Sequence, residues 1–317
     1  MRRTLLLTLA VAACGVEPEP LLLEADEARL PPGVQTVERA ILLQSGGALV
    51  GSGPGRTILK AGGDLVGVVR NADQEEGNSR ILLADLTIDC AGKADYGAFF
   101  VRAENLVVRN VELKGCRRDG ARISGAGQQT RGAFLSDIET HHNRADGLNV
   151  MWAMRDVAYS NIRAYKNGRN GVTFDHSELV AVNIIARGNR RDGVHLRNLF
   201  ATSFTNVSAS RNDRYGVFVE GWVASVGANW RAQNNSNGEP GRYDDIRFSG
   251  SDALSYGATR ASVLSGVFAG EFEEVLEDPT VRHAIAIEDG ADPTLDGVIL
   301  GGSFAEAMCR PCESERL

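Results

Sequence analysis

The sequence predicts an all-β chain wound into a parallel β-helix, a solenoid of roughly ten coils with three short strands per coil. Three observations predict it: a glycine that recurs every 22–27 residues, a short alternating strand after each of these glycines, and asparagines that recur in the same register. The composition agrees, because 36 Gly, 9 Pro and 6% aromatic residues suit a core of stacked small and β-branched side chains.

The glycine repeat gives the coil length. It occurs in the dipeptides Tyr96-Gly97, Asp119-Gly120, Asp146-Gly147, Asn170-Gly171, Asp192-Gly193 and Tyr215-Gly216. An alternating strand follows each glycine, as in Val172-Thr173-Phe174 and Val194-His195-Leu196. Side chains alternate along a strand, so the first and third residues should point inward and the middle one outward. Because one coil cannot bury its apolar positions alone, stability must come from stacking.

Asparagines form two further columns in this register. One lies four residues before the repeat glycine and contains Asn143, Asn167, Asn189 and Asn212, with Cys116 in that position one coil earlier. The other opens a second strand and contains Asn110, Asp137, Asn161, Asn183, Asn206 and Asn229. Stacked amides both donate and accept hydrogen bonds. We therefore expect polar ladders with a structural role.

The N-terminus has the pattern of a targeting segment. Arg2 and Arg3 precede a short apolar stretch, and Val11-Ala12-Ala13-Cys14 matches a bacterial lipobox. We expect residues 1–13 to be a lipoprotein signal peptide and Cys14 to be the lipidation site, which would place the protein in the cell envelope, lipid-anchored, and favours the outer membrane. An ordinary secretion signal with a chance cysteine is the alternative.

The rest of the chain divides by its patterning. Residues 14–35 should form a lipid-anchored tether and N-terminal cap, residues 36–302 the β-helix, and residues 303–317 a C-terminal tail. Only the lipid anchor should bind the membrane, because no apolar run is long enough to span one. Nothing in the pattern requires more than one copy, so a monomer is expected.

Four cysteines remain as disulfide candidates. Cys90 and Cys116 lie about one coil apart and could therefore stack and bridge. Cys309 and Cys312 form one CxxC near the C-terminus. This motif lacks the second pair of a zinc site and the βαβ context of a redox motif, which favours a local disulfide that closes the tail.

The charge distribution points to an acidic partner. The whole chain has a formal net charge of −7, but residues 102–214 contain 18 Lys and Arg against 11 Asp and Glu, which leaves +7 for the middle. An acidic polysaccharide fits this basic middle better than nucleic acid does, because the chain is exported and its arginines are not interleaved with aromatic residues.

Outward positions of successive coils should form columns across the sheet. The column two residues after the repeat glycine contains Arg122, Asn149, Thr173, His195 and Phe218. The column four residues after it contains Ser124, Met151, Asp175, Arg197 and Glu220, and Trp152 and His176 follow one position later in their coils. A carboxylate, an imidazole, an arginine and an aromatic ring together are typical of a site for an acidic sugar.

The repeat pattern resembles the pectin-lyase-like β-helix proteins over residues 36–300, which implies the single-stranded right-handed form. Phe174-Asp175-His176-Ser177 is similar to the Asp-His stretches of pectate lyases and more loosely to the Asp-Pro-His motif of alginate epimerases. No proline separates this pair, however, and in the epimerase register the aspartate should fall at Thr173. Tyr215 also stands where those epimerases have a histidine. No family active site therefore transfers.

The column chemistry suggests removal of the proton beside a uronate carboxylate, by a lyase or a C5-epimerase. The candidate catalytic residues are Asp175, His195 and Arg197, with His195 as the base and Arg197 or Arg191 neutralising the sugar carboxylate. The candidate substrate-binding residues are Arg122, Asn149, Trp152, His176, Arg191 and Glu220. No metal cluster is predicted, although Asp175 and Glu220 could hold a Ca²⁺. The alternative is a solvated ladder of alternating charge.

Two further features are the arginines before the repeat glycine and a pair of adjacent histidines. An arginine stripe precedes the repeat glycine and is either a basic rail for an acidic polymer or a turn ladder paired with aspartates: Arg117, Arg118, Arg144, Arg169, Arg190, Arg191 and Arg214. His141 and His142 are adjacent in a strand or turn, so they should point to opposite sides and make a poor metal pair. Whether the protein is an enzyme stays open, and the alternative is a non-catalytic structural, adhesion or binding lipoprotein.

Overall fold

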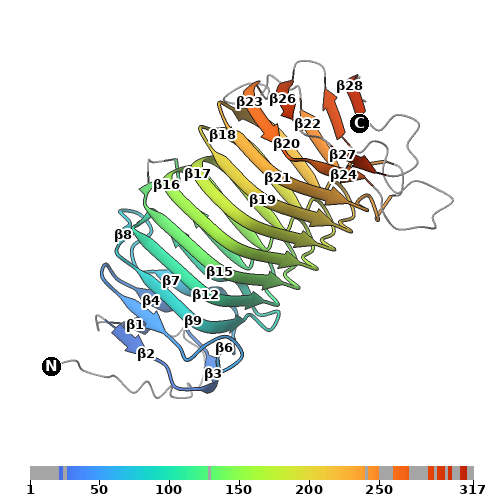
Figure 1. The fold of residues 1–317 in the computed structure, drawn as a ribbon. Helices are drawn as coiled ribbons and strands as arrows, with labels where there is room; N and C mark the ends of the chain where they lie inside the picture. The colour runs from blue at the N-terminus through green and yellow to red at the C-terminus, as the bar shows by residue number, and fades with distance from the viewer. Residues whose placement is uncertain are drawn as a thin grey trace. The chain divides into compact units, whose positions relative to one another are not determined.

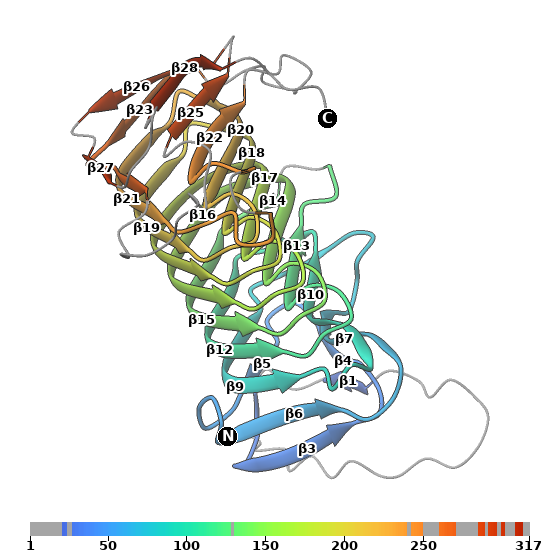
Figure 2. The same cartoon turned by 90° about the vertical axis from the view of Figure 1, so that its right-hand side faces the viewer.

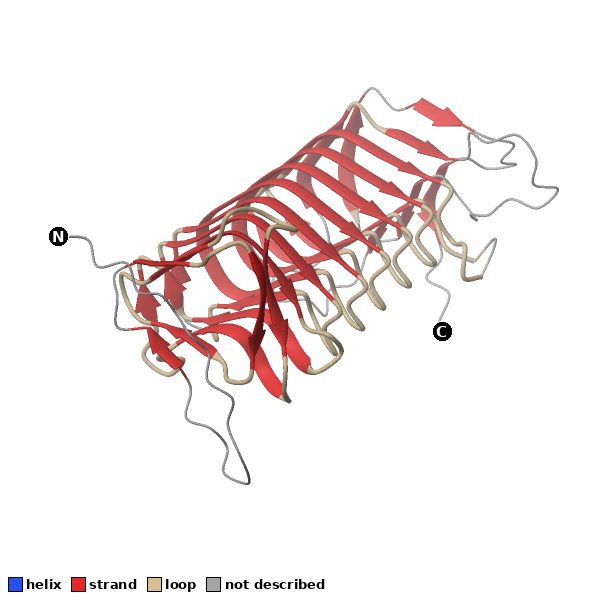
Figure 3. Ribbon diagram, turned by 90° about the horizontal axis from the view of Figure 1, so that it is seen from below, coloured by secondary structure: helices blue, strands red, loops and turns tan. Residues whose placement is uncertain are grey.

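The computed structural model describes residues 21–23, 27–127, 130–239, 242–249, 260–270, 285–288, 291–296, 299–301 and 308–312. The predicted signal peptide and Cys14 lie outside these residues, as does most of the predicted tail. The described residues form strands, turns and bends and no helix (Figure 3). In this part of the chain, no helix is therefore long and apolar enough to cross a membrane. The chain divides into two compact units, residues 1–162 and 163–317.

Every described ladder is parallel, and the strands stack coil over coil. In the first unit, one sheet contains β1 (Leu21–Leu23), β4 (Ile41–Leu43), β7 (Leu65–Asn71), β10 (Ala94–Val101), β13 (Ala121–Ser124) and the start of β16 (Leu148–Tyr165). The other two sheets contain β2 (Glu27–Arg29), β3 (Gly33–Val37), β5 (Ala48–Val50), β6 (Thr57–Ala61), β9 (Leu82–Asp89), β12 (Leu106–Lys114) and β15 (Ala133–His141) (Figures 1 and 2). Short strands β8 (Asn78–Ser79), β11 (Ala103–Glu104) and β14 (Thr130–Arg131) lie in the loops.

The second unit repeats this arrangement. Its first sheet contains the start of β17 (Val172–Arg187), then β18 (Val194–Phe200), β20 (Val217–Val223), β22 (Ile246–Ser249), β25 (Ile285–Glu288) and β28 (Met308–Cys312). The other sheets contain β19 (Ser203–Ser210), β21 (Val226–Gln233), β23 (Arg260–Ser265), β24 (Phe268–Gly270), β26 (Asp292–Asp296) and β27 (Ile299–Gly301). The fold is the predicted parallel β-helix, with about 8 turns instead of the roughly ten coils expected.

The predicted alternation fixes the core. After each repeat glycine the first and third residues are buried, as Val172, Phe174, Val194 and Leu196 are, with at most 1% of their surface exposed. The second and third strands of most coils join into one continuous strand with a bend. Asparagine in the left-handed region makes this bend, for example at Asn206 with φ 57°.

The asparagine ladder forms as predicted. In the second unit Asn167 donates to Asn189, Asn189 to Asn212 and Asn212 to Asn235, over Nδ2–Oδ1 distances of 3.1, 3.0 and 2.8 Å. These side chains are fully buried. Each Oδ1 also accepts the backbone N–H of the preceding asparagine. The ladder ends on Asp245, a group that only accepts. The second asparagine column, by contrast, lies on the surface.

The repeat position requires glycine because atoms of the next coil lie close to it, and not because its φ is unusual. A Cβ on Gly193 would lie 2.6 Å from the Asn212 amide nitrogen and 2.6 Å from the carbonyl oxygen of Gly216 in the next coil. Any side chain would therefore push successive coils apart at the ladder.

In the first unit a disulfide joins Cys90 to Cys116 at the corresponding turn, across 26 residues of sequence. The side chains of Cys309 and Cys312 lie outside the described part.

Candidate functional site

The strongest candidate site lies on the first sheet of the second unit, where β17, β18 and β20 pair in register. Asp175 lies beside Arg197, and Arg197 beside Glu220. His195 lies one outward position earlier, between Thr173 and Phe218. Their inward neighbours are core residues, so these side chains can only face outward. We call Asp175, His195, Arg197 and Glu220 the central cluster.

His195 is held between two carboxylates. Its Nε2 lies 2.6 Å from Oε2 of Glu220, and its Nδ1 lies 3.8 Å from Oδ2 of Asp192. The Asn170 amide nitrogen also approaches Nδ1, at 3.5 Å. Phe218 lies against the imidazole, with the two ring centres 5.2 Å apart. The histidine side chain is 19% exposed, so its orientation is set by the protein and not by solvent.

Arg197 is the most exposed member of the cluster. Its guanidinium lies 3.9 Å from Oε2 of Glu220 and 4.0 Å from Oδ2 of Asp175, and 48% of its side chain is exposed. Asp175 is nearly buried and accepts a hydrogen bond from the Asn198 amide at 3.2 Å. Arg197 is therefore only loosely paired and about half exposed, which suits it to bind an incoming carboxylate.

Burial and charge act in opposite directions on the two carboxylates around His195. Burial alone would raise the pKa of Glu220, but the hydrogen bond from His195 and the charges of His195 and Arg197 outweigh it, so this pKa lies below its ordinary value. Burial raises the pKa of Asp192, against the pull of His195 and Arg214. Glu220 is therefore ionised beside the imidazole, whereas burial works against ionisation of Asp192.

An aromatic platform continues the face beyond the cluster. Tyr215 stacks on Phe218 with ring centres 4.8 Å apart, and Arg214 and Arg247 lie over the Tyr215 ring at 5.4 and 5.8 Å. Burial raises the pKa of Tyr215 to about 12, so its hydroxyl is protonated at neutral pH. Tyr215 is buried and Arg247 pairs with Asp244 and Glu288, so this stack supports the cluster from below and does not present a ring face to solvent.

The other predicted substrate-binding residues are distributed differently. Arg122, Asn149 and Trp152 belong to the first unit. There Arg122 donates to the buried Asp119 at 2.9 Å, Asn149 is buried, and Trp152 is 49% exposed. Arg191 lies exposed in the turn before β18. The side chain of His176 lies outside the described residues.

Some arginines of the stripe are paired with aspartates, as in a turn ladder, and others are exposed, as in a basic rail. Arg117 is paired with Asp95 and Asp64, both at 2.9 Å, and not with an aspartate of its own turn. Arg190 and Arg191, in the second unit, are exposed. The stripe is therefore paired with aspartates at Arg117 and, through Asp192, at Arg214, and it offers exposed charge at Arg190 and Arg191.

Sequence reasoning missed the residue directly before each repeat glycine as part of the site. Asn170, Asp192 and Tyr215 occupy this position and contact His195 or its aromatic neighbour. The signal was present in the aligned dipeptides, but the turn directs these side chains onto the outward column, in the same coil for Asp192 and Tyr215 and in the next coil for Asn170. Within the described residues, no group of three or more His, Cys, Asp and Glu is arranged to hold a metal ion.

Comparison with known proteins places this geometry in a family. The chain belongs to the family described as the right-handed beta helix region, whose model matches residues 75–236. It is 33% identical over 164 residues to mannuronan C5-epimerase AlgE3 of Azotobacter vinelandii and 30% identical over 189 residues to AlgE5 of the same organism. These matches cover 47% and 54% of this chain but only 9% and 18% of the relatives, so the chain spans a small part of their length.

A solved structure supports the fold over a longer region. The A-module of mannuronan C-5 epimerase AlgE6 from Azotobacter vinelandii superposes with a TM-score of 0.63, covering 92% of this chain and 91% of that one at 19% identity. At this identity the likeness shows the shared fold alone.

Proposed function

We propose that this protein acts on an acidic polysaccharide built of uronate residues, by C5-epimerase chemistry at the central cluster. The observation that carries the proposal is the side-by-side placement of Arg197, His195 and Glu220 on the outward face of β18 and β20. The similarity to mannuronan C5-epimerases, which covers about half of the chain, supports the same substrate class.

The chemistry begins at the sugar carboxylate. Arg197 pairs with this group and lowers the cost of the negative charge that develops when the C5 proton leaves. His195 accepts the proton, and Glu220 orients the imidazole and stabilises its charged form. Delivery of a proton from water to the opposite face of C5 gives the epimer, and His195 then releases the proton it took to solvent. Loss of the C4 oxygen from the same carbanion would instead give a lyase product.

The resting geometry places one condition on this mechanism. Because Glu220 is the ionised partner, His195 donates its Nε2 proton to it, and the basic lone pair is on Nδ1. Nδ1 faces Asn170 and Asp192. These two residues therefore screen Nδ1 in the resting structure, and a bound sugar must reach it past the Asn170 amide while Glu220 keeps its hydrogen bond to Nε2.

A second candidate function is that of a non-catalytic lipoprotein that binds polysaccharide. The mutual pairing within the central cluster favours it, because Arg197 lies between two carboxylates as in a structural charge ladder. The lack of an Asp-Pro-His motif around Asp175 favours it as well.

The proposal extends to the location of the protein. A lipobox that ends at Cys14 supports export and acylation, with the β-helix held as a monomer at the outer membrane. Metabolic labelling with radioactive palmitate tests this proposal. The full-length chain should be labelled and the Cys14→Ala variant should not, and equal labelling of both would contradict the anchor.

The activity is tested with polymannuronate in D2O, followed by proton NMR. Epimerisation should produce guluronate signals with deuterium at C5, while a lyase would produce unsaturated uronide that absorbs in the ultraviolet. Parallel samples with Ca²⁺ and with EDTA test a metal requirement. His195→Ala and Arg197→Ala should abolish turnover. Arg187→Ala, an exposed arginine elsewhere on β17, is the matched control.

The outcomes separate the two functions. Turnover that is lost in both cluster variants but kept in the control supports the enzyme. Binding of polymannuronate without turnover supports the binding lipoprotein. If the protein neither binds nor converts any uronan, the proposed substrate class is wrong.

A further inference from the structure

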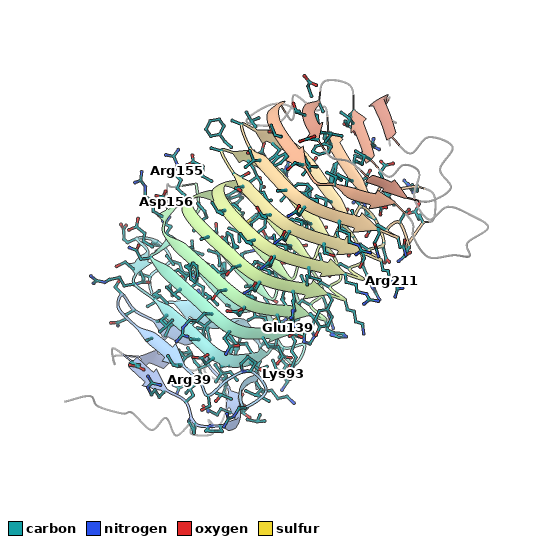
Figure 4. The ribbon with its side chains drawn as sticks, in the orientation of Figure 1. Arg39, Lys93, Glu139, Arg155, Asp156 and Arg211 are labelled. Atoms are coloured by element: carbon teal, nitrogen blue, oxygen red, sulfur yellow. A yellow bond between two sulfur atoms is a disulfide. The ribbon has the colours of Figure 1, made fainter. Side chains whose placement is uncertain are left out.

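A second group of titratable side chains lies in the first unit, where the second halves of β9, β12 and β15 pair. Thr87 lies beside Glu112, and Glu112 beside Glu139, which is labelled in Figure 4. Two residues further along, Lys114 lies beside His141. His142 follows as the first residue beyond β15.

The backbone brings the two adjacent histidines together. His142 adopts φ 55°, in the left-handed region, instead of continuing the strand. Its Nδ1 consequently lies 2.7 Å from Nδ1 of His141, with the rings edge to face and their centres 4.9 Å apart. The alternation rule predicted opposite sides for this pair, and that prediction is wrong because the strand ends at His141.

Glu112 determines the proton positions on His141. Its carboxylate accepts the Thr87 hydroxyl at 2.6 Å and the Lys114 ammonium at 2.9 Å. Nε2 of His141 lies 3.0 Å from the same carboxylate. Because a carboxylate only accepts hydrogen bonds, Nε2 of His141 must carry a proton. The lone pair of neutral His141 is therefore on Nδ1 and points at His142. This is the carboxylate–histidine arrangement that orients a metal ligand.

We propose that Nδ1 of His141 and Nδ1 of His142 form a binding site for Cu²⁺. Two nitrogen ligands in adjacent positions of a square-planar ion, with bonds of about 2.0 Å, lie about 2.8 Å apart. The observed 2.7 Å matches this separation. A tetrahedral ion such as Zn²⁺ needs about 3.3 Å, so it would have to spread the pair.

The surroundings suit a divalent ion with water as its other ligands. His142 is exposed, so solvent reaches the pair, while the side chain of His141 is only 12% exposed and is held by Glu112. Two bonds of about 2.0 Å place the ion beside the line that joins the two Nδ1 atoms, so both rings must turn toward it. The proton shared by the two Nδ1 atoms is released to water, and each neutral ring keeps its proton on Nε2. Lys114 adds little repulsion because its charge is paired with Glu112.

The experiment titrates the purified full chain with CuSO4 and records EPR spectra and the dissociation constant. The wild type should show one Cu²⁺ with hyperfine coupling to two nitrogens and bind Zn²⁺ more weakly. His142→Asn, which keeps a residue suited to positive φ, should lose that signal. Glu112→Gln should weaken binding by about 10–100-fold, the usual effect of losing such a supporting carboxylate.

His195→Ala is the matched control, because it removes a carboxylate-bound histidine in the second unit. It should leave the copper signal and its dissociation constant unchanged. The proposal is overturned if the His142→Asn variant, shown to be folded by circular dichroism, binds copper as the wild type does. A wild-type spectrum without two-nitrogen coupling would overturn it equally.

Discussion

The buried asparagine ladder gives the sharpest test of the fold. Replacing Asn189 with alanine removes two bonds that its Oδ1 accepts from Asn167 and two that its Nδ2 donates, to Ala164 O and Asn212 Oδ1. All four lie in the buried interior. Each buried group left without a partner costs about 1–3 kcal/mol, and water cannot replace the amide unless it enters the core. We expect Asn189→Ala to lower the free energy of unfolding by about 4 kcal/mol.

The matched control is Asn206→Gly, in the exposed column. Asn206 donates to Asn183 over 2.8 Å at the surface, and glycine tolerates its φ of 57°. We expect this change to cost less than about 1 kcal/mol. Urea unfolding of both variants, followed by circular dichroism, gives the two free energies. Equal losses for the two variants would refute the reasoning, because the ladder would then stabilise no more than a solvated amide row does.

Three further predictions test the packing, the disulfide and the central cluster. Gly193→Ala should lower the unfolding midpoint strongly in the same urea assay, since its Cβ would lie 2.6 Å from atoms of the next coil; an unchanged midpoint would contradict this close approach. Cys90→Ala with Cys116→Ala should cost about 3.5 kcal/mol by the loop-entropy relation for a 26-residue separation, and reducing agent should then have no further effect on this bridge. Glu220 has a lowered pKa, so the stability it contributes is present above its ordinary value of 4.5 and is lost as the pH falls through its folded value. The stability difference between wild type and Glu220→Gln should therefore shrink below that pH, and a constant difference would count against the pairing with His195.

Part of the candidate site could be read by counting residues. Asp175, Arg197 and Glu220 stand at the same distance after successive repeat glycines, and the register places them side by side. Counting could not find Asp192, because a turn residue joins an outward column only through the direction of the turn. It also could not show that the nearest partner of His195 lies on the diagonal, at Glu220, and not at the paired Phe218.

The sequence by itself determined the coil, since a repeat of glycine, alternating strand and asparagine leaves one way to bury the apolar positions. It located the ladder of Asn167, Asn189 and Asn212, because equivalent positions in a solenoid must stack. Only the tertiary structure decided what the side chains do on the surface. A single left-handed residue at His142 reverses the direction that alternation assigns, and the ionisation of Glu220 depends on neighbours from another coil. Such contacts depend on φ and rotamer at individual residues, which a periodic pattern does not specify.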